Sequence, residues 1–204
     1  FDIGVAFDGD ADRCMMVTED GRVLDGDRIM AACALKRKKE GKLPHDTFVA
    51  TVMSNLGLHA FAEKHGLKLL CANVGDRYVL EEMTKGGYTL GGEQSGHVIF
   101  SDIVTTGDGE LTAVQFLKLM KDTKQKASYF YEQIEEYPQK LINVPVPNAL
   151  KKEIVKMPSV AALIEAESKR FGAQGRILVR PSGTEALVRV MVEGKDSGEV
   201  ARVC

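Results

Sequence analysis

Three aspartates with alternate spacing carry the first chemical signal in this chain. Asp8, Asp10 and Asp12 lie in the run IGVAFDGDADR at residues 3–13, separated by small residues that leave room for an ion. Carboxylate oxygens are the ligands that hard divalent cations prefer in proteins. Carboxylates so close together also repel one another unless a cation or an arginine offsets their charge. The spacing predicts a metal loop at the end of a strand, and Mg²⁺ is the expected ion.

Two other interpretations of this loop stay open. Together with Glu19, the aspartates almost reproduce the calcium loop of helix-loop-helix proteins, but that loop needs glycine at its sixth position, where this chain has Arg13. The residues before the loop also have the composition of a short buried strand rather than the pattern of an amphipathic helix. The second alternative is a solvated acidic turn between two strands.

Two further polar stretches lie between apolar strand candidates. Residues 92–97 read GEQSGH, in which the glycines allow a close approach while Glu93 and Ser95 can exchange hydrogen bonds with sugar hydroxyls. Residues 180–185 read RPSGTE, which offers an anion one guanidinium, two hydroxyls and an accessible backbone N–H. Each stretch could also be an ordinary turn containing glycine.

In this order, DGDADR, GEQSGH and RPSGTE resemble the metal, sugar-recognition and phosphate-binding loops of the α-D-phosphohexomutases. Residues 74–83 (VGDRYVLEEM) and 105–113 (TTGDGELTA) are similar to the phosphoglucosamine mutase branch of that family. The resemblance covers nearly the whole chain. It departs at Ala186, where a proline commonly follows RPSGTE in the family.

The resemblance implies a role for each of these stretches. The three aspartates would hold Mg²⁺, and Arg13 would be the catalytic residue beside the transferring phosphoryl group, unless it only pairs with its own aspartates. Weaker substrate contacts are implied at Asp76 and Arg77, in a loop before a helix. The residues implied to bind the substrate are Glu93, Ser95, His97, Arg180, Ser182, Gly183 and Thr184.

The activity implied is reversible phosphoryl transfer between glucosamine 6-phosphate and glucosamine 1-phosphate, through a phosphoserine and a bisphosphorylated sugar. The serine loop of the family, of the type TASHNP, does not occur in these 204 residues. We therefore expect the C-terminal part of a longer enzyme, inactive alone, whose partners are the N-terminal domains and a phosphorylated amino sugar. The alternatives are a phosphoglucomutase or phosphomannomutase, and a non-catalytic fragment that binds sugar phosphates.

Composition limits the partners and the cellular location that the chain can have. With 44% apolar residues the chain can bury a core, and its formal charge of -2 gives no reason to expect nucleic acid as a partner. The four cysteines show no CxxC spacing, and no apolar run has the length of a membrane span or the flanks of a signal peptide. We expect a reduced, cytoplasmic protein without a membrane partner.

The periodicity predicts the fold class and its division. Strands and helices alternate after residue 47, which indicates an α/β domain, a mixed sheet with helices on both faces, followed by a smaller α+β domain with an antiparallel sheet. Residues 1–24 would be the C-terminal remnant of a preceding α/β domain and carry the metal loop. Residues 25–140 would form the α/β sugar-recognition domain. Residues 141–204 would form the phosphate-binding domain, truncated at its C-terminus.

Particular strands must position the three loops. A strand at residues 14–18 follows the metal loop. Strands at residues 88–90 and 98–100 flank GEQSGH, and strands at residues 176–179 and 187–192 flank RPSGTE.

Two helices are expected around these loops. Asp25 should cap a helix to about residue 40, whose basic run at residues 36–39 is typical of a solvated helix end. A helix at residues 110–122 is strongly amphipathic. Its expected apolar positions are Leu111, Val114, Leu117 and Leu119.

Overall fold

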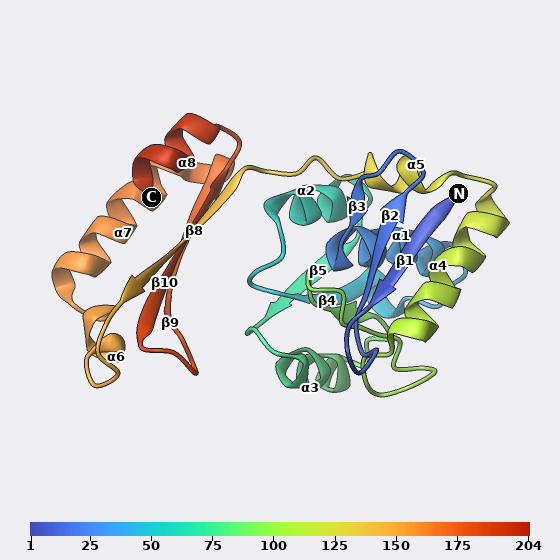
Figure 1. The fold of residues 1–204 in the computed structure, drawn as a ribbon, viewed down its shortest axis with the longest axis horizontal. Helices are drawn as coiled ribbons and strands as arrows, with labels where there is room; N and C mark the ends of the chain where they lie inside the picture. The colour runs from blue at the N-terminus through green and yellow to red at the C-terminus, as the bar shows by residue number, and fades with distance from the viewer. The chain divides into compact units, whose positions relative to one another are not determined.

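The computed structural model describes residues 1–204, with the side chain of Ala173 left out. The chain forms two compact units, Phe1–Glu135 and Glu136–Cys204, which are described separately (Figure 1). Among the described residues, no helix combines the length and the apolar character that crossing a membrane requires.

The first unit contains two sheets and five α-helices among the described residues. Its strands are β1 (Ile3–Phe7), β2 (Cys14–Thr18), β3 (Val23–Leu24), β4 (Thr47–Thr51), β5 (Lys68–Ala72), β6 (Gly91–Gly92) and β7 (Val98–Ile99). Its helices are α1 (Gly26–Lys39), α2 (Leu56–Lys64), α3 (Asp76–Gly86), α4 (Gly109–Thr123) and α5 (Ala127–Tyr131), with a 3₁₀ turn at Pro44–Asp46.

The first sheet is antiparallel, in the order β1-β2-β3, and the loop with the three aspartates joins its first two strands. The apolar composition of β1 predicted a buried strand, and this prediction was wrong because Val5 and Phe7 are exposed. They pair with Met16 and Cys14, which are buried. β1 is the edge strand of its sheet, and the elements that cover Met16 and Cys14 do not extend over Val5 and Phe7.

Helix α1 lies at the centre of the first unit (Figure 1). Asp25 caps it as predicted, because its carboxylate accepts a hydrogen bond from the backbone N–H of Arg28 at 3.1 Å. Every residue from Gly26 to Ala34 is buried, since α2, α4 and α5 all pack against this helix. A helix that is buried all round is typical of a position inside a core.

The second sheet is mixed, in the order β5-β4-β6-β7. β4 pairs in parallel with β5 and β6, while β6 and β7 are antiparallel. All residues of β4 are buried, because Phe48 and Ala50 face the core around α1 whereas Val49 faces the core under α3. Helices therefore cover both faces of this sheet, which confirms the predicted class (Figure 1).

The strand predicted at residues 88–90 begins later than expected. The structure has β6 at Gly91–Gly92 instead. A Cβ on Gly91 would lie 2.5 Å from the sulfur of Met83 and 3.0 Å from the carbonyl oxygen of Val49. Two glycines thus form a strand where close packing leaves no space for a side chain, which propensity alone does not indicate.

Helix α4 has nearly the predicted extent but a different buried face. Asp108 caps it and accepts a hydrogen bond from the backbone N–H of Leu111 at 2.8 Å. Val114 and Leu117, both expected in the core, are 59% and 41% exposed. Phe116 is fully buried instead, and its ring meets that of Phe130 in α5 edge to face, with 5.3 Å between centroids.

The second unit is a small α+β domain. Its strands are β8 (Gln139–Pro145), β9 (Gly175–Pro181) and β10 (Leu187–Gly194), and its helices are α6 (Lys151–Ile154), α7 (Pro158–Phe171) and α8 (Ser197–Val203), with a 3₁₀ turn at Gly172–Gln174. The sheet has the order β8-β10-β9 with both pairs antiparallel, as predicted. Helices α7 and α8 pack on it (Figure 1).

We expect Phe116, on the buried face of α4, to contribute more to stability than the exposed Val114. Replacing Phe116 with alanine should lower the free energy of unfolding by about 3–5 kcal/mol, because it removes a fully buried ring and leaves a cavity. The matched change Val114→Ala on the same helix should alter it by less than about 0.5 kcal/mol. Denaturant unfolding of both variants measures the difference, and equal losses would contradict the assigned face.

Candidate active site

The three aspartates between β1 and β2 converge. Each can present one carboxylate oxygen so that the three atoms lie within 4.8 Å of one another. Burial raises the pKa of Asp12, and the charges of Asp10 and Asp8 raise it further. Oδ1 of Asp12 is buried and accepts no hydrogen bond from any described residue. A divalent cation would offset this repulsion and bind the unused acceptor oxygen. The donor set therefore fits Mg²⁺.

Glu19, which suggested a calcium loop, serves another purpose. Its carboxylate accepts hydrogen bonds from the backbone N–H of Ser128, at 3.1 Å, and from the hydroxyl of the same residue at the start of α5. The aspartate loop is flanked by antiparallel strands rather than by helices. These two observations exclude the helix-loop-helix interpretation.

The start of α4 holds the backbone of the metal loop. Ala11 adopts a left-handed conformation with φ 58°, and its carbonyl accepts a hydrogen bond from the backbone N–H of Gly109 at 2.9 Å. A Cβ on Gly109 would lie 2.5 Å from the carbonyl oxygen of Arg13 and 2.8 Å from that of Ala11. Glycine therefore lets the helix begin against the loop, where the positive end of its dipole favours nearby carboxylates.

Arg13 lies on the solvent side of the carboxylates. Its Nε is 3.7 Å from Oδ2 of Asp8 and 3.8 Å from Oδ1 of Asp12, while half of its side chain is exposed. These distances are long for hydrogen bonds. The guanidinium thus offsets part of the carboxylate charge and keeps donors available to a further anion.

His97 lies on the interior side of the same loop. It is buried and pairs with Arg13 through an isolated antiparallel bridge, and its Nε2 is 3.7 Å from Oδ2 of Asp12. A Cβ on Gly107 would lie 2.2 Å from that nitrogen, so Gly107 packs directly against the imidazole. His97 therefore supports the metal loop from within, and its contact with substrate stays a prediction.

The GEQSGH loop connects β6 and β7 and is fixed by backbone hydrogen bonds. Its Gly96 carbonyl accepts from the backbone N–H of Cys14 at 3.0 Å, and its Gln94 carbonyl accepts from that of Gly26 at 2.9 Å. Gly96 has φ 95°, and a Cβ there would lie 2.4 Å from the carbonyl oxygen of Cys14. The metal loop and the sugar loop are thus joined directly, and Ser95 is left exposed.

Glu93 is oriented from the start of α3. Its Oε1 accepts a hydrogen bond from the backbone N–H of Gly75 at 2.9 Å. Asp76 and Arg77 follow as the first residues of α3, which corrects the expected loop position. Arg77 is exposed and pairs with Glu81 at 2.9 Å. The substrate contacts expected of Asp76 and Arg77 stay predictions, whereas the residue before them now has a role in holding the sugar loop.

Several glycines that hold the site together were missed by the sequence analysis. A Cβ on Gly26 would lie 2.0 Å from the carbonyl oxygen of Glu93, so only glycine at the start of α1 allows the helix to meet the sugar loop. Gly107 and Gly109 have the same role beside the metal loop. Both lie in TTGDGELTA, and their position around the α4 cap, Asp108, was the available signal.

The RPSGTE turn joins β9 and β10 in the second unit. Its neighbours Arg176 and Arg189 pair with Glu193 at 2.7 Å and with Glu185 at 2.6 Å. Arg180, in contrast, has no carboxylate within 4.0 Å among the described residues, and burial and then the charge of Arg189 lower its pKa. An arginine without a compensating carboxylate is suited to hold an anion.

Ser182 shapes this turn. It is buried, and its hydroxyl accepts a hydrogen bond from the backbone N–H of Glu185 at 3.2 Å. Lys151, which the sequence gave no reason to select, donates to the carbonyl oxygens of Ser182 at 2.6 Å and Glu185 at 3.1 Å. Gly183 and Thr184 are exposed. The exposed tip of the turn is therefore held from behind by a lysine of α6.

The chain matches two models of one protein family and several relatives of known activity. Residues 25–137 match the model described as phosphoglucomutase/phosphomannomutase, alpha/beta/alpha domain III, and residues 141–204 match the C-terminal domain of the same family. Phosphoglucosamine mutases from Caldanaerobacter subterraneus subsp. tengcongensis and a Thermoanaerobacter species are 52% identical over 99% of this chain. That of Streptococcus pyogenes is 50% identical over 98%. The chain spans 44% to 45% of the length of these relatives.

Solved structures share the fold. A crystal structure of an N-acetylglucosamine-phosphate mutase in its product complex gives a TM-score of 0.80 at 23% identity, covering 98% of this chain and 47% of that one. The Aspergillus fumigatus N-acetylphosphoglucosamine mutase in complex with GlcNAc-6P and magnesium gives 0.79 at 21%, covering 98% and 46%. From the two family models and the relatives, the chain belongs to the phosphoglucomutase/phosphomannomutase family, the α-D-phosphohexomutases.

Proposed function

We propose that the protein containing this chain interconverts glucosamine 6-phosphate and glucosamine 1-phosphate as a phosphoglucosamine mutase. The observation that carries the proposal is the convergence of Asp8, Asp10 and Asp12 directly beside the GEQSGH loop. A cation site bonded to a sugar-recognition loop suits phosphoryl transfer on a sugar. The curated relatives that cover this chain are phosphoglucosamine mutases, which supports the choice of amino sugar.

Each loop has a distinct part in the proposed reaction. Mg²⁺, held by the three aspartates, would offset charge during phosphoryl transfer. Arg13 would contact oxygens of the reacting phosphoryl group through its exposed guanidinium. Glu93, oriented by Gly75, would accept hydrogen bonds from sugar hydroxyls, and Arg180 would hold the phosphate that is not reacting. The phosphoserine that donates the group would lie outside these 204 residues.

The domain boundaries and the location are part of this proposal. Residues 1–24 would complete a preceding domain, residues 25–140 would recognise the sugar, and residues 141–204 would bind phosphate. Amino-sugar phosphates and N-terminal domains of the same enzyme are the proposed partners, and the cytoplasm is the proposed location.

Two alternatives are separated by simple assays. A phosphoglucomutase or phosphomannomutase would use the same kinds of loop, so the complete enzyme is tested with glucosamine, glucose and mannose 6-phosphates. A higher kcat/KM for glucose or mannose 6-phosphate would overturn the proposed substrate. Residues 1–204 alone should not turn over any of them, because no phosphoserine is present to donate a phosphoryl group.

The metal loop is tested with Asp10→Asn in the complete enzyme. The change removes one charge from the ligand set, so the apparent affinity for Mg²⁺ should fall roughly tenfold or more while the fold is kept. Asp2→Asn, an exposed aspartate outside the cluster, is the matched control and should bind as the unchanged protein does. Magnesium titration of the activity measures both, and normal rates at low magnesium in Asp10→Asn would disprove the metal role.

The support of the metal loop by α4 is tested with Gly109→Ala. Its Cβ would displace the carbonyls of Ala11 and Arg13, so the affinity for Mn²⁺, a paramagnetic substitute for Mg²⁺, should fall at least about tenfold. Gly9→Ala lies within the loop itself, where a Cβ meets nothing within 4 Å, and should bind almost normally. Electron paramagnetic resonance gives both affinities. The role of α4 is wrong if the two variants behave alike.

The phosphate turn is tested with Arg180→Lys. Lysine keeps the charge but loses the two parallel hydrogen bonds of a guanidinium, so KM for the sugar phosphate should rise roughly ten- to a hundredfold, with a smaller fall in kcat. Arg189→Lys on the same hairpin is the control, because that arginine already pairs with Glu185. Steady-state kinetics gives both values, and an unchanged KM in Arg180→Lys would mean that RPSGTE is only a turn.

A further inference from the structure

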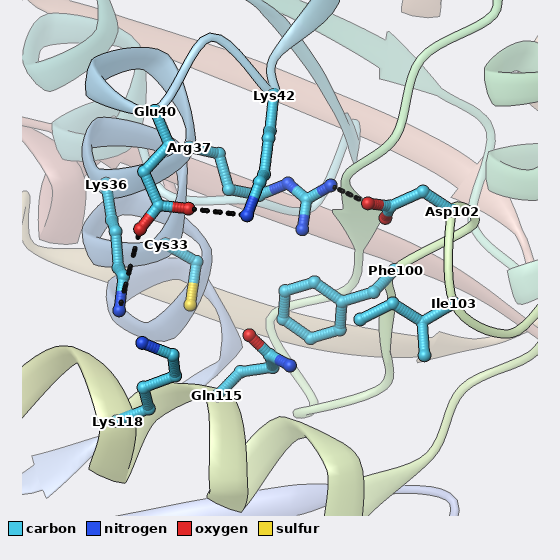
Figure 2. A pocket seen from close by; sticks show the side chains of 10 residues that line it. All are labelled: Cys33, Lys36, Arg37, Glu40, Lys42, Phe100, Asp102, Ile103, Gln115 and Lys118. Atoms are coloured by element: carbon cyan, nitrogen blue, oxygen red, sulfur yellow. Dashed lines mark ion pairs between the residues drawn. The ribbon is translucent and has the colours of Figure 1, made fainter.

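A cavity of about 300 Å³ lies in the first unit, between α1, α4 and the segment after β7 (Figure 2). None of the residues assigned to the metal, sugar or phosphate loops lines it. The cationic side chains around it are Lys36, Arg37, Lys42 and Lys118. They come from two separate stretches of the chain, residues 36–42 and α4, and line one space, so this is a second polar site in the same unit.

The first two residues of the basic run at residues 36–39 are not solvated as expected. The side chain of Lys36 is 16% exposed and that of Arg37 is 7% exposed. Burying a cation is costly unless partners replace the water that it loses. The basic run is therefore not simply a solvated helix end. The partners of Lys36 and Arg37 show what replaces the water that these side chains lose.

Arg37 has more donors than partners. Its Nη2 lies 2.6 Å from Oδ2 of Asp102, but Nε and Nη2 are buried without a well-formed hydrogen bond to any described residue. Its guanidinium lies 5.7 Å from the ring centroid of Phe100, and Figure 2 shows it between Lys42 and Asp102, in the wall of the cavity. A guanidinium carries five N–H donors in a rigid fork. Because Nε and Nη2 are buried, Nη1 is the nitrogen of this fork that can donate to a ligand.

The lysines share the carboxylates that remain. Lys36 and Lys118 both contact Oδ2 of Asp122, at 2.6 and 2.7 Å, and Lys42 lies 3.1 Å from Oε2 of Glu40. The carboxylates of Asp122, Glu40 and Asp102 therefore pair with the four cations of the cavity. One positive charge is left over.

The other ionisable group in the wall adds no negative charge. Cys33 lines the cavity, and burial raises its pKa to about 12, so it is a neutral thiol at physiological pH. Gln115 adds an amide donor, while Phe100 and Ile103 form an apolar side. The cavity thus combines surplus positive charge, an available guanidinium nitrogen and an apolar side formed by Phe100 and Ile103.

We propose that this cavity binds a phosphate group, either as inorganic phosphate or as part of a small metabolite. A tetrahedral oxyanion can accept hydrogen bonds from Nη1 of Arg37 and from the surrounding lysines at the same time. It would also offset the surplus charge. The volume lies at the small end of ligand pockets, which suits a phosphate with a short carbon part against Phe100. The proposal does not depend on the mutase reaction.

The test uses the ¹⁵N-labelled 204-residue chain, titrated with inorganic phosphate at constant ionic strength. The backbone amide signals of Phe100 and Ile103 report on the cavity, and those of Gly183 and Thr184 report separately on the phosphate turn. We expect saturable shifts at the cavity. A second titration with glucosamine 6-phosphate distinguishes the two sources, since tighter binding than inorganic phosphate at Ile103 would identify a metabolite.

Matched variants decide whether the cationic wall is responsible. The double change Lys42→Gln and Lys118→Gln should weaken phosphate binding at the cavity at least about tenfold, and both side chains are more than half exposed, so the fold should be kept. Lys121→Gln on α4 removes a charge outside the cavity and should leave the affinity unchanged. No saturable shift at Ile103, or equal affinity in the double variant, would overturn the proposal whatever happens at the phosphate turn.

Discussion

Repulsion among three neighbouring carboxylates is the constraint on which the first unit depends. Asp8, Asp10 and Asp12 are held close together although their charges oppose it, and burial together with those charges raises the pKa of Asp12. The surrounding structure opposes the repulsion from two sides. Arg13 supplies positive charge toward solvent, and the first turn of α4 supports the loop through the N–H of Gly109. The loop therefore depends on elements almost a hundred residues away in sequence.

Helix ends and strand alternation could be read from the sequence because they depend on local chemistry. Asp25 has a short side chain that satisfies free N–H groups at a helix start, and the caps of α2 and α4 act in the same way. The errors concern burial. Val114 is apolar but exposed, and so is Val5 in the edge strand β1. Composition shows which residues can be buried, and only the packing shows which of them are.

The three motifs of the candidate site could be found in the sequence, whereas the residues that hold them in place could not. The motifs stand out because several functional groups are close in sequence, as in the run from Asp8 to Arg13. The supports are single residues that act across long separations, such as Lys151 behind the RPSGTE turn and Gly26 against the sugar loop. Such residues have no functional group pattern of their own. Their importance lies in a close contact with the backbone of a segment that is far away in the sequence, and one sequence does not show such contacts.

The hydrogen bond between Cys14 and Gly96 has a consequence for motion. It joins the strand after the metal loop to the sugar loop, while Gly109 joins the same metal loop to α4. Segments linked in this way open as one cooperative unit rather than one by one. Amide hydrogen exchange at Cys14 and Gly109 should therefore proceed with a common opening free energy. A cation held by Asp8, Asp10 and Asp12 would therefore be bound by a loop whose backbone is tied to the start of a helix, not by an isolated loop.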